Sequence, residues 1–352
     1  MNSDKRRVQC SVDAYLRELE LQILSDGGHY ELSPMYHANV LQDAMVVGTL
    51  LGTGNAAADR LHESIVPAQH WLDAMRMTPE SWANVNDSWT IPSLARTVWD
   101  GRPWTPTSGI NHLKHSGYVR GGNRRWEWLL DVGSVGPAFN PRHSHSDSMS
   151  VLLSYDGIPL IVDPGVLHYS PNDERRFLKS CHSHNGPCLR DRDHTEMIGS
   201  FRVGRAGRAR MEKSSVEAHF HAVTASLDGY DEVSVVREIN SWPNRFEIVD
   251  TWSPRGNRSF APWSRFLWNA DIANVDQCSV GADAISLRFH CSQNRLILHL
   301  HVQILGCSNP RLAIHESWYS DRILKTLLVF ETIATGESAT DTVQLRTVAT
   351  LL

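Results

Sequence analysis

The sequence predicts an α+β multidomain protein, in which a helical part precedes an antiparallel β-sandwich. Apolar residues recur three or four apart up to Pro79, prolines interrupt the chain after it, and short alternating apolar runs fill the rest. A chain of 352 residues is expected to form about two domains. We therefore expect a helical domain at residues 1–105 and a sandwich at residues 106–352.

Three helices are predicted in the first part of the chain. The first ends at Asp26-Gly27-Gly28, and Ser33-Pro34 supplies an N-cap and first residue for the second. Their predicted buried faces, with that of the third helix, are Val12, Leu16, Leu19 and Ile23; Val40, Ala44, Val47 and Leu51; and Leu61, Ile65, Ala68, Leu72 and Met75. Antiparallel helices of this kind build either a bundle or a helical toroid. Beyond them, Asn86-Asp87-Ser88 is typical of a turn or cap.

Strand periodicity begins at about residue 115. The clearest run is residues 296–304, where leucines, Val302 and Ile304 alternate with His299, His301 and Gln303. This spacing predicts a strand with one wet face, so these histidines are expected to be solvated. Many short strands without an intervening helical period favour an antiparallel sandwich.

Composition excludes several classes of protein. The net charge of -5 gives no electrostatic support for a nucleic-acid partner. No apolar run reaches the roughly 20 residues of a membrane span, and no apolar signal core follows the charged N-terminus. The six cysteines form no CxxC pair, so free thiols are expected.

The chemistry-bearing residues gather between Asp131 and Arg192. On an extended chain, His143 and His145 point to the same side. With Asp163 and His184 they offer the ligand types that zinc prefers. Each also has a plainer interpretation: Asp163 as a turn residue, Asp147 or Asp173 as a cap, and Arg175-Arg176 as an exposed pair. So many ionisable groups beside core strands are costly unless they pair, bind a ligand or line a cleft.

Several motifs, in order, resemble the heparinase II/III-like polysaccharide lyases. They are "LELQILSDGGHYELSPMYH", "NDS", "HSGYVRGG", "HSHSDSMSVLLSYDGIPLIVDPGVLHY", "RRFLKSCHSHN" and "GSFRVGRAGRARM". The resemblance implies an (α/α) toroid, here partial, followed by a β-sandwich, with a substrate cleft between them. It also implies β-elimination at a uronic acid, which needs neutralisation of the C6 carboxylate, a base for the C5 proton and an acid for the departing O4.

The resemblance also assigns site residues. Tyr36 and His143 match the catalytic tyrosine and histidine, and His145, Asp163 and His184 match the ligands of a structural zinc. In addition, the expected substrate-binding residues are Glu31, His37, Arg175 and Arg176. For Arg175 or Arg176, a grip on the substrate carboxylate and a structural role both stay open. The implied partner is an anionic uronate polysaccharide, and the implied location is the cell envelope or periplasm, with a cytoplasmic location not excluded.

The chain departs from the family pattern in two places. Val236-Arg237 stands where the family usually has a His-Arg pair, and the family's toroid is longer and carries an upstream Asn-His pair. Asn111-His112 has the same letters but lies between the domains, so we do not expect it to substitute. We expect the C-terminal part of a lyase: a fragment, a truncated reading frame or one half of an assembly. An open half-toroid would leave an apolar helix face uncovered, which predicts self-association or a partner.

Two function classes follow. The first is an active lyase on a uronate polysaccharide, with a uronate C5 epimerase as a variant that begins with the same proton abstraction. The second is a non-catalytic or biosynthesis-associated sugar-binding protein with the same fold. The mild negative charge favours a less sulfated polymer.

Overall fold

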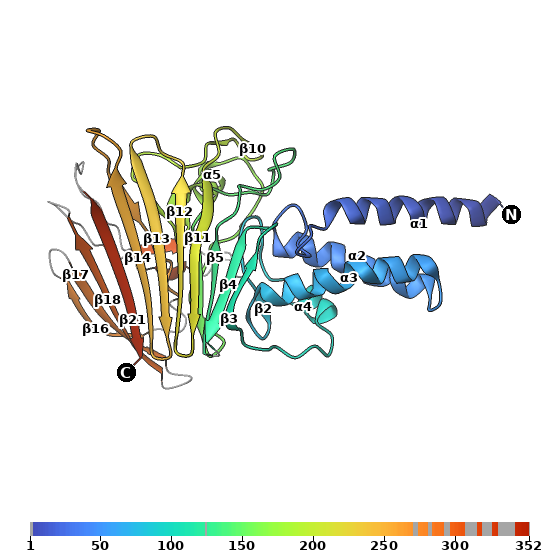
Figure 1. The fold of residues 1–352 in the computed structure, drawn as a ribbon, viewed down its shortest axis with the longest axis horizontal. Helices are drawn as coiled ribbons and strands as arrows, with labels where there is room; N and C mark the ends of the chain where they lie inside the picture. Colours follow the sequence, from blue (N-terminus) through green and yellow to red (C-terminus); the bar gives the residue numbers. More distant parts are fainter. Residues whose placement is uncertain are drawn as a thin grey trace.

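Helices, a five-stranded sheet and an eight-stranded sheet form three layers in the computed structural model (Figure 1). The structure describes residues 3–123, 125–269, 274–280, 284–291, 296–306, 315–318, 326–329 and 342–351. Both larger sheets are antiparallel, which confirms that part of the predicted fold class.

The helical layer contains the three predicted helices. The helices are α1 (Ser3–Gln22), α2 (Pro34–Leu51), α3 (Ala56–Ala74), the short α4 (Pro92–Val98), and later α5 (Asp173–Lys179) and the 3-10 turn η1 (Cys181–Ser183). As predicted, Ser33 caps α2 by accepting a hydrogen bond from the Tyr36 backbone N–H at 3.4 Å. The five α-helices of the described residues do not close a ring, so the toroid stays a prediction.

Part of this helical layer carries exposed apolar side chains. On α1 and α2, Val8, Leu21, Val46 and Leu50 are between half and four-fifths exposed. Self-association or a partner over these helices stays a prediction.

None of the helices in the described residues has the length and apolarity needed to cross a membrane.

The central strands of the five-stranded sheet are buried on both faces. Its strands follow one another as β3 (Ser108–Leu113), β4 (Tyr118–Asn123), β5 (Trp126–Asp131), β6 (Val151–Tyr155) and β7 (Ile158–Ile161). Trp128 and Leu130 face the eight-stranded sheet, whereas Leu129 packs with the helices. Burial on two faces explains why β5 reads as an almost continuous apolar run.

The eight-stranded sheet covers the other face. In spatial order its strands are β11 (Arg208–Glu217), β12 (Phe220–Asp228), β13 (Val233–Trp242), β14 (Arg245–Pro254), β21 (Val343–Leu351), β18 (Leu296–Leu305), β17 (Ala284–Cys291) and β16 (Asn274–Val280). Four two-stranded sheets complete the fold: β1 (Arg76–Thr78) with β2 (Ser81–Trp82), β8 (Pro187–Leu189) with β15 (Pro262–Ser264), β9 (Met197–Ile198) with β10 (Arg202–Val203), and β19 (His315–Trp318) with β20 (Thr326–Val329).

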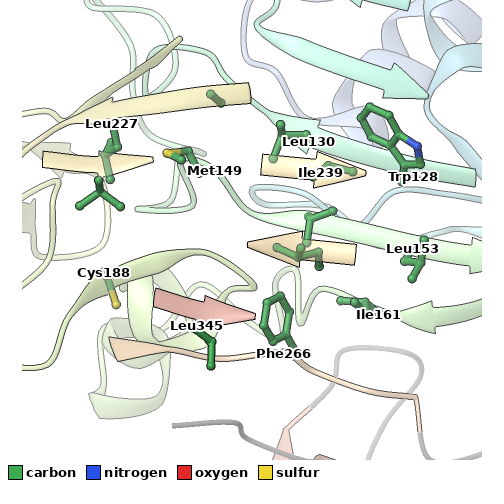
Figure 2. Close-up of a cluster of buried hydrophobic side chains, with 14 of the residues drawn as sticks. Trp128, Leu130, Met149, Leu153, Ile161, Cys188, Leu227, Ile239, Phe266 and Leu345 are labelled. Carbon is green, nitrogen blue, oxygen red and sulfur yellow. The ribbon is translucent and has the colours of Figure 1, made fainter. Parts of the chain in front are cut away.

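The core of the sandwich lies between the two large sheets. Figure 2 shows Trp128, Leu130 and Leu153 of the inner sheet in one cluster with Leu227 and Ile239 of the outer sheet. Each such side chain contributes about 1.5–3 kcal/mol when it is fully buried. This core holds the two sheets together.

The predicted alternation in β18 is confirmed where its side chains are described. Leu300, Val302 and Ile304 are buried, whereas His299 and His301 are partly exposed. The side chains of residues 296–298 lie outside the described residues. So do those of Cys278, Cys291 and Cys307, whereas Cys10, Cys181 and Cys188 are free thiols, as expected.

His37 is a core residue of the helical layer, which corrects its predicted role in substrate binding. Its side chain is fully buried against Trp71, with ring centroids 4.5 Å apart. Nδ1 accepts a hydrogen bond from the His29 N–H at 3.0 Å, and Nε2 donates to the Ala68 carbonyl at 2.9 Å. Neither ring nitrogen is left to contact a sugar.

Acid should destabilise the protein through His37. Burial lowers the pKa of His37 to about 3 from its ordinary 6.5, so only the unfolded chain binds this proton at intermediate pH. Stability is therefore complete above the ordinary value and is lost as pH falls from 6.5 toward 3, by about 1.4 kcal/mol per pH unit. In urea unfolding at neutral pH and at about pH 5, His37→Gln should show a smaller loss than the wild type. His62→Gln, at an exposed position of α3, is the control, and equal losses in all three proteins would contradict the prediction.

Candidate active site

A buried carboxylate, Asp87, is the centre of the site. Arg175 grips both of its oxygens, with Nη1–Oδ1 and Nη2–Oδ2 distances of 2.5 and 2.7 Å. His143 Nδ1 lies 3.1 Å from Oδ2, and His145 Nε2 lies 2.8 Å from Oδ1. Burial alone would raise the pKa of Asp87, but these hydrogen bonds outweigh it and hold the pKa well below its usual range. Asp87 is therefore an anion that orients two histidines.

The backbone around Asp87 ties the helical layer to the histidine loop. The Asp87 N–H donates to the His143 carbonyl at 2.9 Å, and the Ser33 hydroxyl donates to the Asp87 carbonyl at 2.8 Å. Asn86 has a φ of 56°, in the left-handed region that asparagine tolerates. Its side-chain oxygen accepts from the His145 N–H at 2.9 Å. Asn86-Asp87-Ser88, predicted only as a turn or cap, is a junction between distant segments.

Tyr36 and His143, the two predicted catalytic residues, are in contact. Their ring centroids are 4.1 Å apart, and both side chains are partly exposed. The Tyr36 hydroxyl lies 2.9 Å from the Tyr169 hydroxyl. Burial raises the pKa of Tyr36 above its ordinary value, so its phenol keeps its proton near neutral pH. The structure thus places a proton donor beside an oriented imidazole.

The second nitrogen of His143 lies near Glu31, and the His143 side chain lines a cavity. Nε2 lies 3.9 Å from the Glu31 carboxylate, which also accepts a hydrogen bond from Asn140 Nδ2 at 3.2 Å. A cavity of about 440 Å³ adjoins this ring and is lined by Arg142, His143, Phe201 and Arg202. Its two arginines suit an anionic ligand. Glu31 therefore lies at the predicted site.

The paired arginines of α5 separate, and this corrects the predicted substrate contact of Arg175. Arg175 is fully buried, and both of its terminal nitrogens donate hydrogen bonds to Asp87. Arg176 points outward, two-thirds exposed, and pairs with Asp173 one turn earlier. Of the two roles left open for this pair, Arg175 takes the structural one, and a substrate contact of the exposed Arg176 stays a prediction.

The predicted zinc ligands lie deeper, next to Asp87. His184 Nδ1 is 2.8 Å from Asp163 Oδ2, and the rings of His145 and His184 have centroids 5.2 Å apart. Because His145 Nε2 donates to Asp87, the lone pair of His145 is on Nδ1. The three residues stay a predicted ligand set, brought together by the fold.

Three buried atoms in this region are unsatisfied. Within the described part of the chain, His145 Nδ1, His184 Nε2 and Asp147 Oδ2 have no hydrogen-bond partner. Burial and the charge of Asp163 raise the pKa of Asp147 to about 6, against the influence of His184. Two imidazole lone pairs and a carboxylate oxygen are zinc ligands. These unsatisfied atoms are of the types that bind zinc, so the zinc site stays a prediction, and Asp147 is a further candidate ligand.

Arg237 connects the outer sheet to the site. It is fully buried on β13 and binds Asp250 of β14 with Nε and Nη2, at 2.6 and 2.7 Å. Its remaining nitrogen, Nη1, donates to the carbonyls of Met149 and Asn185. This arginine thereby fixes two loops that flank the histidines. It does so although the residue before it is Val236 and not the histidine expected from the family pattern.

Sequence reasoning missed Asp87, Tyr169 and Arg142. Asp87 lies in the "NDS" motif and Tyr169 in "VLHY", both of which carried the family resemblance. The order of these motifs is visible in the sequence. The contacts that Asp87 and Tyr169 make in the site are not, because they join residues 56 and 133 positions apart. Asn111 and His112 lie on β3, at the edge of the five-stranded sheet.

Replacing Asp87 should be costly to the fold. Asp87→Asn keeps the shape but leaves Arg175 as a buried charge without its counter-ion, which costs about 3–5 kcal/mol of unfolding free energy. Chemical denaturation measures this loss. Asp173→Asn, which removes the exposed partner of Arg176, is the matched control and should change stability little. Similar stabilities for the two variants would contradict the central role of Asp87.

Comparison with known proteins agrees with this architecture. A solved heparinase III matches with a TM-score of 0.75 and 17% identity, over 97% of this chain and 57% of that chain. Heparan sulfate lyase HepC from Pedobacter heparinus matches with a TM-score of 0.73 and 15% identity, over 100% and 57%. This chain thus spans a little more than half the length of these relatives, and at such identities they show the fold alone. No curated protein matches the sequence.

Family models match most of the chain. The model described as "Heparinase II/III N-terminus" covers residues 2–98, and "Heparinase II/III-like, C-terminal" covers residues 105–347. The chain therefore belongs to the heparinase II/III-like family.

Proposed function

We propose that the protein is a polysaccharide lyase that cleaves a uronic-acid-containing anionic polysaccharide by β-elimination. The observation that carries this proposal is the contact between Tyr36 and His143, whose ring centroids are 4.1 Å apart. His143 lines a cavity that is also lined by Arg142 and Arg202. The family, and relatives named as a heparinase and a heparan sulfate lyase, support it.

His143 is the proposed base. Its Nδ1 lies on the Asp87 carboxylate, and since that carboxylate is ionised, Nδ1 carries the proton and Nε2 the lone pair. Nε2 lies 3.9 Å from the Glu31 carboxylate, and the His143 side chain lines the cavity. An Asp-oriented imidazole with a free Nε2 is suited to removing the C5 proton of a uronate.

Tyr36 is the proposed acid. Its phenol keeps its proton near neutral pH, and its ring lies against that of His143. It can therefore deliver a proton to the departing O4 while the imidazole accepts one from C5. Tyr169, hydrogen-bonded to Tyr36, holds the hydroxyl in place. Arg142 and Arg202 are the proposed cations that offset the C6 carboxylate.

The proposed zinc has a structural role. His145, Asp163 and His184, with Asp147 beside them, would hold it, since His145, Asp147 and His184 each present an unsatisfied buried atom. Such an ion supplies charge neutralisation and crosslinks loops, and does not contact the sugar in this proposal. Because His145 also binds Asp87, the ligand set supports the orientation of the base.

Tyr36→Phe should remove turnover without unfolding the protein. Loss of a general acid lowers the rate by about 10²- to 10⁴-fold. The assay is the ultraviolet absorbance of the unsaturated uronate product, on a panel that includes heparan sulfate and unsulfated uronate polymers. Tyr15→Phe, which removes a buried hydroxyl of α1 without a hydrogen-bond partner among the described residues, is the control and should keep full activity.

The remaining outcomes separate the alternatives. Activity retained by folded Tyr36→Phe would refute the assignment of the acid. Polymer binding without product from the wild type would favour a sugar-binding protein. Exchange of the C5 proton without chain cleavage would indicate an epimerase.

Zinc should be retained by protein purified without chelators. The proposed site takes about one ion per chain, and elemental analysis of the variant His145→Ala/His184→Ala should show about one ion fewer than the wild type. His299→Ala/His301→Ala, which changes two partly exposed histidines of β18, is the control. Equal zinc contents in all three proteins would overturn the ligand set.

A further inference from the structure

A second cluster of metal-ligand side chains lies at the end of α5. Cys181 and His182 are in η1 and Cys188 is in β8, and the ligand atoms of the three residues all lie within 4.8 Å of one another. Both thiols are buried, whereas His182 is partly exposed. Neither the proposed catalytic groups nor the predicted zinc set includes any of them.

His182 is oriented as a metal ligand. Its Nε2 donates to the Leu189 carbonyl at 3.0 Å, so the neutral imidazole that binds a metal has its lone pair on Nδ1. Nδ1 points toward the Cys181 sulfur, 3.7 Å away, and lies 3.8 Å from Asp193 Oδ1. A histidine that donates one N–H to a backbone carbonyl and turns the other nitrogen toward thiols has the arrangement found around bound zinc.

The two cysteines are held in place by the surrounding backbone. The Cys181 N–H donates to Asp193 Oδ1 at 2.6 Å, and the Cys188 carbonyl accepts from Trp252 Nε1 at 3.0 Å. Cys188 also pairs with Trp263 in the β8–β15 ladder, and Figure 2 shows its sulfur at the edge of the sandwich core. The ligands are therefore preorganised, so binding an ion requires little further ordering.

We propose that Cys181, His182 and Cys188 form a second, thiolate-containing site for zinc or a similar thiophilic divalent ion. Two thiolates, one imidazole and a fourth ligand, either Asp193 or water, make a tetrahedral set. Binding releases the two thiol protons to solvent, and the two thiolates balance the charge of the ion. A bound ion would join η1 to β8 and thereby fix the segment between them, which contains His184.

Cobalt substitution tests this site separately from the histidine and aspartate site. Co²⁺ bound to thiolates gives an intense near-ultraviolet charge-transfer band, which a site of histidines and carboxylates does not produce. The wild-type protein loaded with Co²⁺ should show the band. Cys181→Ser/Cys188→Ser should lose it together with about one bound ion per chain. Cys10→Ser, which changes an exposed thiol, and His145→Ala/His184→Ala should both keep it.

Three results would overturn the proposal. They are a wild-type protein without the band, a band that survives in Cys181→Ser/Cys188→Ser, and a disulfide between Cys181 and Cys188 in non-reducing peptide maps. Should the double variant not fold, His182→Gln decides. This variant keeps both sulfurs, so it should retain the charge-transfer band but shift the visible ligand-field bands of Co²⁺, and an unchanged visible spectrum would exclude His182 as a ligand.

Discussion

The ion pair between Asp87 and Arg175 is the interaction on which the site depends. Removing two charges from water costs several kcal/mol per ion, and only close, multiple hydrogen bonds offset that cost. Here both carboxylate oxygens accept from the guanidinium, and each also meets a histidine. The pair therefore fixes α5, the Asp87 segment and the histidine loop relative to one another. The same geometry explains why Arg175 has no free terminal nitrogen with which to bind a substrate.

A second buried pair, Arg237 with Asp250, supports the loops from the outer sheet. Since its third nitrogen reaches the carbonyls of Met149 and Asn185, the sandwich core and the proposed site are mechanically linked. The inner sheet, covered on one face by helices and on the other by the outer sheet, provides the rigid layer between them. Residues of the proposed site come from helical and sheet segments alike, so neither part forms it alone.

Local patterns in the sequence predicted the first three helices, the change to strands and the antiparallel sandwich, because periodicity reports which side of an element is buried. They did not predict the short helices α4 and α5. They could not predict the partners of single polar residues. Arg175 and Arg176 are adjacent letters, yet a helix turns by about 100° per residue, so one is buried and the other exposed. His37 follows Tyr36 in the same motif, but the phase of α2 turns it into the core. Asp87 resembled a turn residue because its four partners lie far away in the chain.

Buried carboxylates near the predicted zinc ligands give a physical reason to expect a cation there. Burial and the charge of Asp147 raise the pKa of Asp131 well above its ordinary value, and burial raises that of Asp147 to about 6. A raised pKa means that the folded state favours the protonated form, so ionising these groups near neutral pH opposes folding. Neither carboxylate is paired with an arginine, unlike Asp87 and Asp250, in the contacts that the described residues make. A bound divalent ion would let them stay ionised at lower cost, because its charge offsets their mutual repulsion. Folding of this half of the proposed site and metal binding would then be one coupled equilibrium.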